Sequence, residues 1–507
     1  MATSTADRPH TAASPARRPW AALAVLMLPV LLISVDNTVL SFAVPAISEA
    51  LRPGGTQLLW IVDAYPLVLA GLLVPMGSLG DRVGRRRLLL IGSSGFALVS
   101  ALAAFAPNAA LLIAARAALG FFGAMLMPAT LSLIRNIFVD PTKRRMAIAI
   151  WASGFSGGAA LGPVIGGLLL EHYWWGSVFL MAVPVLIPLL ALAPVLVPES
   201  RDPEPGPVDP LSILLALGAM VPFVYGIKAI AEHGWTSLGG PSILAGVLVG
   251  AGFVWRQLRR RTPLLDVRLF TNPVFSGSVT ANLLSVVSLV GFIFFVSQHL
   301  QLVSGRTPME AGLFLVPGLL TTVVAGLAVV QVVRRVRPGH AVAGGLLLNA
   351  VGYGVVLTSG ANGSDVGLLI AFVILGAGVG AAETISNDLI LASVPPAKAG
   401  AASAVSETAY ELGAVLGTAV LGSILTAVYR ANVVIPPQLG EEDARAAGET
   451  LGGATEVARG LPPDLGRALL DSAQQAFDSG VVITSAIGVG LMLLATGIVL
   501  RTLRTAT

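Results

Sequence analysis

Gly77-Ser-Leu-Gly-Asp-Arg-Val-Gly-Arg-Arg-Arg87 separates two long apolar runs and predicts a sharp turn between two helices. Glycines at positions 77, 80 and 84 allow a tight turn and a close approach of backbones. Asp81 can pair with an arginine or lie at a helix N-terminus, where the helix dipole favours an anion. The arginines are typical of a loop on the cytoplasmic side of a membrane. The stretch therefore predicts a cytoplasmic turn between two membrane-spanning helices.

The composition of the whole chain agrees with this interpretation. Of the 507 residues, 55% are hydrophobic and 11% are charged, and the mean hydropathy is +0.83. A soluble protein carries about 25% charged residues. The apolar residues come in blocks of roughly 20, the length with which a helix crosses a bilayer.

Fourteen such blocks predict an all-α membrane protein with fourteen transmembrane helices. The blocks show no alternation of apolar and polar residues, which excludes a membrane β-barrel. The predicted spans are 21–45, 57–79, 88–106, 109–134, 146–169, 175–197, 211–229, 241–256, 274–299, 309–333, 341–359, 366–392, 403–428 and 480–500.

The basic residues predict the orientation of the chain. Most of the 31 lysines and arginines fall in the tails and in loops on the N-terminal side of the membrane. Few fall on the other side, and Lys228 is counted there, while Arg116 lies within a span. Positive loops stay in the cytoplasm, so we expect a multi-pass protein of the bacterial cell membrane with both termini cytoplasmic.

The sequence offers no sign of an enzyme or of a cofactor. It contains no cysteine, and its five histidines are widely separated, so no metal-ligand spacing is visible. A phosphate-binding loop with Gly-Lys-Ser/Thr is absent. We therefore expect no metal and no cofactor. We expect the energy to come from an ion gradient, the proton motive force, and not from bound ATP.

One loop, 429–478, is long and carries more acids than arginines. Two stretches within it, 441–459 and 464–478, are expected to be helical. An acidic lid that attracts cations and a solvated outer loop are both compatible with this composition.

Several motifs occur in an order that resembles the major facilitator superfamily. The Gly77–Arg87 stretch is similar to its signature loop, and Asp36–Pro45 resembles the first-helix signature of the fourteen-helix drug:proton antiporters. Arg116–Gly120 resembles a buried-arginine motif, and Gly158–Gly167 resembles the antiporter motif of exporters. Two further stretches also match, Trp174–Pro184 and Glu407–Glu411. The resemblance is closest to exporters of quaternary ammonium compounds and intercalating dyes of the QacA, SmvA and LfrA type.

This resemblance implies two six-helix bundles that work by alternating access around a central cavity. The composition of residues 1–19 predicts a disordered cytoplasmic tail. The division expected for the rest is an N-terminal bundle at 20–197, inserted helices 7 and 8 with linkers at 198–273, a C-terminal bundle at 274–501 with 429–478 as an extracellular loop, and a tail at 502–507. The residues expected to control conformational change are Gly77, Gly80, Asp81, Arg82, Gly84, Arg85, Gly158, Gly162, Pro163, Gly166 and Gly167.

Asp36 is the candidate proton carrier. It follows a long uncharged run within the first span, and an acid inside a bilayer is functional by default because its insertion is costly. Arg116 is the natural countercharge, and the resemblance places its equivalent near the proton site. A helix-packing hydrogen bond at Asp36 and a purely structural Arg116 remain open alternatives.

Four further acids are candidates for substrate binding. Glu407 and Glu411 lie on one helix face with Tyr410 beside them, and two carboxylates on one face favour a shared proton or a bound cation. A wetted position near the cytoplasmic end is the alternative for this pair. Asp63, between Trp60 and Tyr65, suits a flat cation, or else an interfacial aromatic belt. The fourth acid is Glu383 in the twelfth span.

Together these features predict a proton-coupled efflux antiporter for lipophilic cations that functions as a monomer. The expected partners are small lipophilic cations, protons and the bilayer, without nucleic acid. Because the tenth span has no acid beyond Glu310 at its edge, single-charge cations are expected to be handled better than dications with distant charges. A dedicated exporter of a self-made antibiotic, a siderophore or a lipid is the alternative.

Overall fold

A computed structural model describes residues 18–504 except 202–208, 234–237, 360–364 and 396–398. The tails expected at 1–19 and 502–507 therefore lie mostly outside the described residues. The described part of the chain is helical and contains no strand. In the hydrocarbon of a bilayer a helix satisfies every backbone hydrogen bond within itself, which accounts for this uniform architecture.

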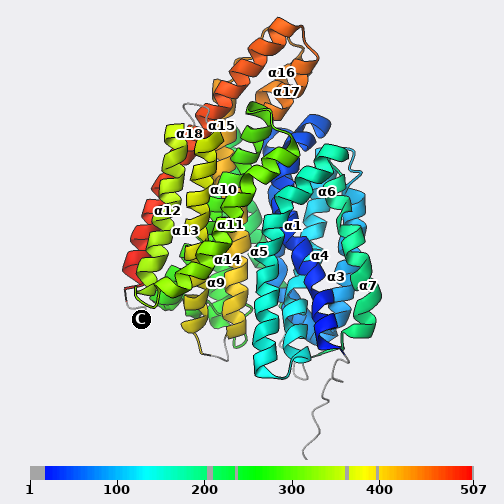
Figure 1. The fold of residues 1–507 in the computed structure, drawn as a ribbon, viewed down its shortest axis with the longest axis vertical. Coiled ribbons are helices and arrows are strands. Elements are labelled where there is room, and N and C mark those ends of the chain that lie inside the picture. Colours follow the sequence, from blue (N-terminus) through cyan, green and yellow to red (C-terminus); the bar gives the residue numbers. More distant parts are fainter. Residues whose placement is uncertain (1–17, 202–208, 234–237, 360–364, 396–398, 505–507) are drawn as a thin grey trace, which may run out of the picture.

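The first half of the chain forms a bundle of six spans (Figure 1). Helix α1 packs on α5, and α4 packs on both α2 and α3. The short helix α6 and α7 together form the sixth span. The helices are α1 (Pro19–Leu51), α2 (Gly55–Val83), α3 (Arg85–Ala103), α4 (Ala109–Ile137), α5 (Pro141–His172), α6 (Ser177–Leu180) and α7 (Ala182–Leu196).

Two further spans, α8 (Pro210–His233) and α9 (Gly239–Arg259), pack on each other between the two halves of the sequence. Asp209 ties this pair together at its beginning: its carboxylate lies 2.9 Å from Arg256 and 3.1 Å from Arg260. Helix α8 also packs against α2 and α15, so it contacts both halves of the molecule.

The second half forms the other bundle, in which α13 packs on α11 and α12, and α18 on α12. Thr307 caps α11, and Glu310, the acid at the edge of this span, completes the capping box by accepting the Thr307 N–H at 3.0 Å. Two spans contain a π-helical turn, η2 and η5. The elements are η1 (Val267–Thr271), α10 (Pro273–Gln298), η2 (His299–Val303), α11 (Pro308–Val332), α12 (Pro338–Ser359), α13 (Asp365–Ala392), α14 (Ala399–Leu416), η5 (Gly417–Gly422), α15 (Ser423–Asn432), α16 (Glu441–Glu449), α17 (Leu451–Arg459) and α18 (Pro463–Thr502).

The helices confirm a fourteen-helix membrane protein. Thirteen helices of the described residues are long and apolar enough to cross a bilayer, and α5, with 32 residues and an apolar stretch at Leu161–His172, completes the fold. Helix α1 begins and α18 ends at one end of the molecule, and α16 and α17 lie at the opposite end (Figure 1). We call these the termini end and the α16–α17 end.

The long segment between the last two spans is more ordered than a solvated loop. The stretch expected to be helical at 441–459 forms two helices, because Thr450 has extended backbone and its hydroxyl caps α17 by accepting the Gly453 N–H at 3.0 Å. Residues 464–478 are helical as expected, but they are the first part of α18 and not a separate element.

Helices α16 and α17 connect the two bundles at their end of the molecule. Glu449 of α16 accepts the Gly55 N–H of α2 at 2.9 Å and also pairs with Arg430 of α15. Arg459 of α17 lies 3.0 Å from Glu49 of α1. These polar contacts hold the first and second bundles together at the α16–α17 end.

Candidate functional site: buried charges where the bundles meet

Asp36 and Arg116 form a buried ion pair inside the first bundle. The Arg116 Nη1 atom lies 2.8 Å from Asp36 Oδ2, and only 4% of Asp36 and 2% of Arg116 are exposed. The two residues come from the middle of α1 and the first third of α4. The structure therefore brings together the two residues that the sequence analysis assigned to proton coupling.

Helix α2 holds the rest of the Arg116 guanidinium. Pro66 has no N–H, so the carbonyl of Val62 lacks its helical donor, and Arg116 Nη2 lies 3.5 Å from that oxygen. Arg116 Nε donates to the Ile61 carbonyl at 3.1 Å, and the guanidinium carbon lies 4.6 Å from the centre of the Tyr65 ring. Tyr65, expected beside Asp63 as a substrate residue, thus packs against Arg116.

Glu411 faces this ion pair from the second bundle. It lies on α14, is buried, accepts a hydrogen bond from Asn37 of α1, and is close enough to Asp36 to interact with it electrostatically. Asn37 was not singled out in the sequence. One acid of each bundle therefore lies within electrostatic range of the other.

Glu407, Tyr410 and Glu383 extend the acidic region toward the termini end. Glu407 lies one turn before Glu411 and interacts electrostatically with Arg135 on α4. Tyr410 lies close to both Glu383 and Glu411. The structure thus gathers the residues that the sequence predicted separately in the twelfth and thirteenth spans.

Asp63 has a partner that the sequence analysis missed. Lys228 Nζ lies 2.8 Å from Asp63 Oδ2, and both side chains are fully buried. The same ammonium lies 4.1 Å from the centre of the Trp60 ring. Counting Lys228 among the residues on the far side of the membrane was wrong, because α8 continues past it to His233 and its side chain is fully buried against Asp63 of α2. Arg116 and Lys228 are both buried bases.

The Gly77–Arg87 stretch forms the expected turn and is anchored to the end of α7. Gly84 adopts φ +113°, which an L side chain rarely adopts, and a Cβ there would lie 2.8 Å from the Glu199 carboxylate. Arg85 pairs with Asp81 at 2.7 Å and donates to the Ser200 hydroxyl at 3.0 Å. The turn therefore couples α2, α3 and α7.

The other glycines of this region mark close helix contacts. A Cβ at Gly77 would lie 3.4 Å from Pro128 of α4, and one at Gly80 would lie 3.2 Å from Leu88 of α3. Arg82 is exposed at the turn.

The Gly158–Gly167 stretch packs α5 against two partners. Gly158, Gly162 and Gly166 lie against Ser34, Thr38 and Val39 of α1. Further along, Gly167 lies against Met309, and the Pro163 carbonyl lies against Gly312, both in α11 of the second bundle. One small-residue helix thus supports the first bundle and closes it against the second.

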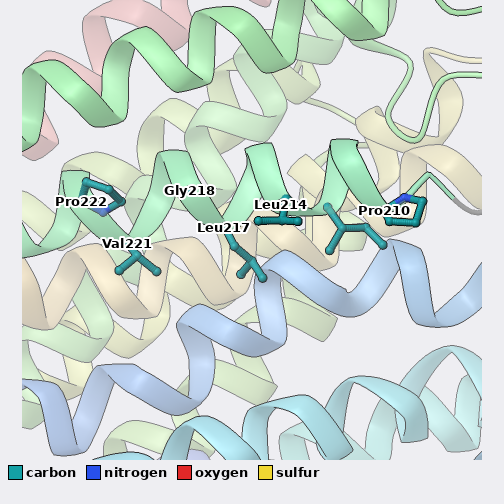
Figure 2. A pocket seen from close by; sticks show the side chains of 7 residues that line it. Pro210, Leu214, Leu217, Gly218, Val221 and Pro222 are labelled. Carbon is teal, nitrogen blue, oxygen red and sulfur yellow. The ribbon is translucent and has the colours of Figure 1, made fainter.

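A shallow groove on α8 is too apolar to bind a cation. Figure 2 shows it, and its lining consists only of Pro210, Ile213, Leu214, Leu217, Gly218, Val221 and Pro222. Within the described ranges, no group of three histidine, aspartate or glutamate residues could hold a metal ion. The chemistry of this protein therefore centres on the buried acids and their two bases.

Comparison with known proteins assigns these features to a family. The model of the Major Facilitator Superfamily matches residues 26–418. This chain belongs to the Major Facilitator Superfamily. Proteins of this superfamily are transporters, so the chain is not an enzyme, and its fold is two six-helix bundles with two inserted helices.

Relatives within the superfamily are exporters. The multidrug efflux pump LfrA of Mycolicibacterium smegmatis is 57% identical over 98% of this chain and 99% of its own length. The methyl viologen resistance protein SmvA of Salmonella typhimurium is 38% identical over 95% and 97% of the two chains. The tetracenomycin C resistance and export protein of Streptomyces glaucescens is 33% identical over 99% and 96%. The predicted relationship to drug exporters is thus confirmed.

A solved structure supports the fold. A bacterial homologue of the human lysosomal transporter Spinster aligns with a TM-score of 0.64 at 18% identity, covering 96% of this chain and 98% of the other. The present chain therefore shares its helix arrangement with a transporter of known structure.

Proposed function

We propose that this protein is a proton-coupled multidrug exporter of lipophilic cations that works by alternating access as a monomer. The observation that carries the proposal is the position of Glu411 of the second bundle beside Asp36 and Asn37 of the first. Acids from both bundles meet at the interface that must open and close during transport. Proton and drug binding at these acids can therefore control whether the bundles approach each other.

Asp36 is the proposed proton-coupling residue, with Arg116 as its partner. When Asp36 is ionised, the 2.8 Å ion pair fixes α1 to α4. Protonation of Asp36 would remove its electrostatic attraction to Arg116. The guanidinium would then be held only by the carbonyls of Ile61 and Val62. The proton thus changes the packing of α1, the helix that also contacts Gly158, Gly162 and Gly166 of α5.

Glu407 and Glu411, with Tyr410 and Glu383 beside them, are the proposed substrate-binding acids. A cation between two carboxylates on one helix face relieves their repulsion, and low dielectric strengthens the attraction. We assign Asp63 and Trp60 to a neighbouring region that Lys228 already occupies. The 57% identity to LfrA, named a multidrug efflux pump, supports a broad rather than a single substrate.

The proposed orientation places both termini, and hence the termini end, in the cytoplasm of a bacterial cell. The basic Gly77–Arg87 turn lies on that side, as the positive-inside rule requires. The α16–α17 end is then extracellular, and the contacts of Glu449 and Arg459 close it. In this state the acids would receive a drug from the cytoplasm. We retain the division into an N-terminal bundle at 20–197, inserted helices at 198–273 and a C-terminal bundle at 274–501 as part of this proposal.

Everted membrane vesicles test the proposal directly. Respiration acidifies their lumen, and a lipophilic cation such as ethidium is expected to accumulate inside until a protonophore releases it. Adding the cation to vesicles with an imposed pH gradient is expected to drive protons out of the lumen. Failure of every lipophilic cation to move protons would overturn the proposal.

A dedicated exporter of an antibiotic is the second candidate. The 33% identity to the tetracenomycin C resistance and export protein favours it, because that relationship covers nearly the whole of both chains. In the vesicle experiment, proton release by a neutral aromatic antibiotic, but by none of the cations, would establish this alternative.

A further inference from the structure

Lys228, Asp63 and Trp60 make an arrangement that proteins use to bind ammonium ions. The Lys228 Nζ atom lies 2.8 Å from the Asp63 carboxylate, with no exposed surface on either side chain. It also lies 4.1 Å from the centre of the Trp60 ring. A carboxylate and an aromatic face on the same cation combine charge and cation–π attraction.

Three separate parts of the chain enclose this arrangement. Asp63 and Trp60 come from α2 of the first bundle, and Lys228 comes from the inserted helix α8. Thr418 of η5, in the second bundle, faces the Asp63 carboxylate, and Arg116 is near enough to interact with it electrostatically. Trp60 packs with Met220 against an apolar cluster of Leu67, Val224, Val415 and Ala419.

An ionised Asp63 at this depth needs a cation beside it. A buried carboxylate without its countercharge is strongly unfavourable, and so is a buried ammonium. Arg116 does not replace Lys228, because its guanidinium is paired with Asp36 and bonded to the carbonyls of Ile61 and Val62. The place beside Asp63 therefore requires an ammonium group of its own.

We propose that Trp60 and Asp63 form an ammonium-binding site and that Lys228 is its tethered ligand. The ligand class is a primary alkylammonium ion, held by charge at one carboxylate and by the face of one indole. Because Lys228 is part of the chain, the site is filled without a substrate, and it attaches α8 to α2. Cationic substrates are then left to the acids of α14, and this assignment does not depend on export.

Chemical rescue tests the site without measuring transport. The Lys228→Ala substitution removes three carbons and the nitrogen of the side chain, and n-propylammonium supplies the same atoms. The purified variant is expected to unfold at a lower temperature than the parent protein. Addition of n-propylammonium chloride is expected to raise its Tm with saturation, beyond the effect of sodium chloride at equal ionic strength, while the parent protein responds equally to both salts.

Three control variants identify the groups responsible. The double variant Lys228→Ala/Asp63→Asn is expected to lose the response, because no carboxylate remains. Lys228→Ala/Trp60→Leu is expected to need a higher n-propylammonium concentration for half of the effect. Arg116→Ala, which also breaks a buried ion pair, is expected to show no rescue by n-propylammonium.

The proposal is overturned if n-propylammonium and sodium chloride act alike on Lys228→Ala, or if the Asp63→Asn double variant responds as strongly. If Lys228→Ala cannot be purified, n-propylammonium in the growth medium and buffers is expected to restore its monodisperse yield. Restoration by sodium chloride alone, or an equal lack of yield with both salts, would also overturn the proposal.

Discussion

The carbonyl oxygen of Pro163 in α5 lies directly against Gly312 in α11 and leaves no room there for a Cβ. The two residues belong to different bundles, so the bundles touch here backbone against backbone. Gly167 and Met309 repeat this contact further along the same two helices. The approach of the bundles in this state thus depends on the absence of a side chain at two positions.

We predict that Gly312→Val shifts the protein toward the state that is open at the α16–α17 end. A valine cannot fit against the Pro163 carbonyl, so the closed arrangement is destabilised while the open one is not. Since the chain has no cysteine, a single cysteine introduced at position 42 in place of Phe42 reports how accessible that position is from the α16–α17 end. It is introduced both into the parent protein and into the Gly312→Val variant. Its labelling rate by a membrane-impermeant maleimide is expected to rise several-fold in Gly312→Val. Gly354→Val, where a Cβ would meet open space, is the matched control, and an equal rise in both would refute the prediction.

We predict that Asp36→Asn abolishes uphill export and leaves binding of the cation intact. The asparagine side chain neither binds nor releases a proton at physiological pH, but it has nearly the same shape as aspartate and can still accept a hydrogen bond from Arg116. Ethidium accumulation in energised everted vesicles is expected to fall at least tenfold. Fluorescence titration of the purified variant is expected to give a Kd within a few-fold of the parent value. Accumulation at the parent rate would refute a role in coupling.

We predict that Glu407→Gln weakens cationic substrates more than neutral ones. Glu407 adds a negative charge one turn from Glu411, and its loss removes attraction for a cation while leaving apolar contacts unchanged. Binding of a monovalent dye is expected to weaken about tenfold, which corresponds to roughly 1.4 kcal/mol. A neutral substrate is expected to change less than twofold. Equal losses for both would assign Glu407 to coupling instead of recognition.

The same binding measurement tests whether the protein binds dications with widely spaced charges less tightly than single-charge cations. The span α11 has Glu310 only as a capping residue, so no acid deep in this helix can hold a distant second charge. A monovalent dye is therefore expected to bind more tightly than a bis-cation of similar apolar area with widely spaced charges. Tighter binding of the bis-cation would refute this prediction.

We predict that Asp209 stabilises the α8–α9 pair in a pH-dependent way. Partial burial opposes its ionisation, but hydrogen bonds from Arg256 and Ser212 outweigh this and lower the pKa of Asp209 to about 2 from an ordinary value of 3.8. A depressed pKa means that the stabilisation is complete above the unfolded-state pKa and is lost as the pH falls toward the folded-state pKa. The Tm difference between the parent protein and Asp209→Asn is therefore expected to be constant above about pH 5 and to shrink from pH 4 toward 2. A difference that grows on acidification would contradict this.

The fold could be predicted from the sequence because the bilayer leaves few choices. Long apolar runs must be helices, so span number and approximate bounds followed from residues alone. The pairing of Asp36 with Arg116 was also predictable, because each is an isolated charge within an apolar run. Buried charges need partners, and few were available.

Lys228 was missed because it lies close to the end of a predicted span. A basic residue there is normally at the membrane surface, but Lys228 lies inside α8, which ends at His233, and contacts Asp63 and Trp60 of α2. A signal was available in the sequence: Asp63 was an intramembrane acid without an assigned base, and Lys228 is one of three lysines in the chain. Asn37 and Arg135 could not have been found in this way, because polar residues near helix ends or beside an acid carry no pattern of their own.

The ion pair between Lys228 and Asp63 links two parts of the chain that could otherwise have separate histories. Removing the inserted helices would leave Asp63 as an uncompensated anion in the first bundle, and removing Asp63 would leave a lysine stranded in α8. Each change by itself leaves an uncompensated buried charge, so we expect gain or loss of the inserted helices to require a compensating substitution at the other position. We therefore expect a shortened twelve-helix version of this transporter to fold only when residue 63 is neutral. The first bundle in its present form depends on the inserted helices for the countercharge of Asp63.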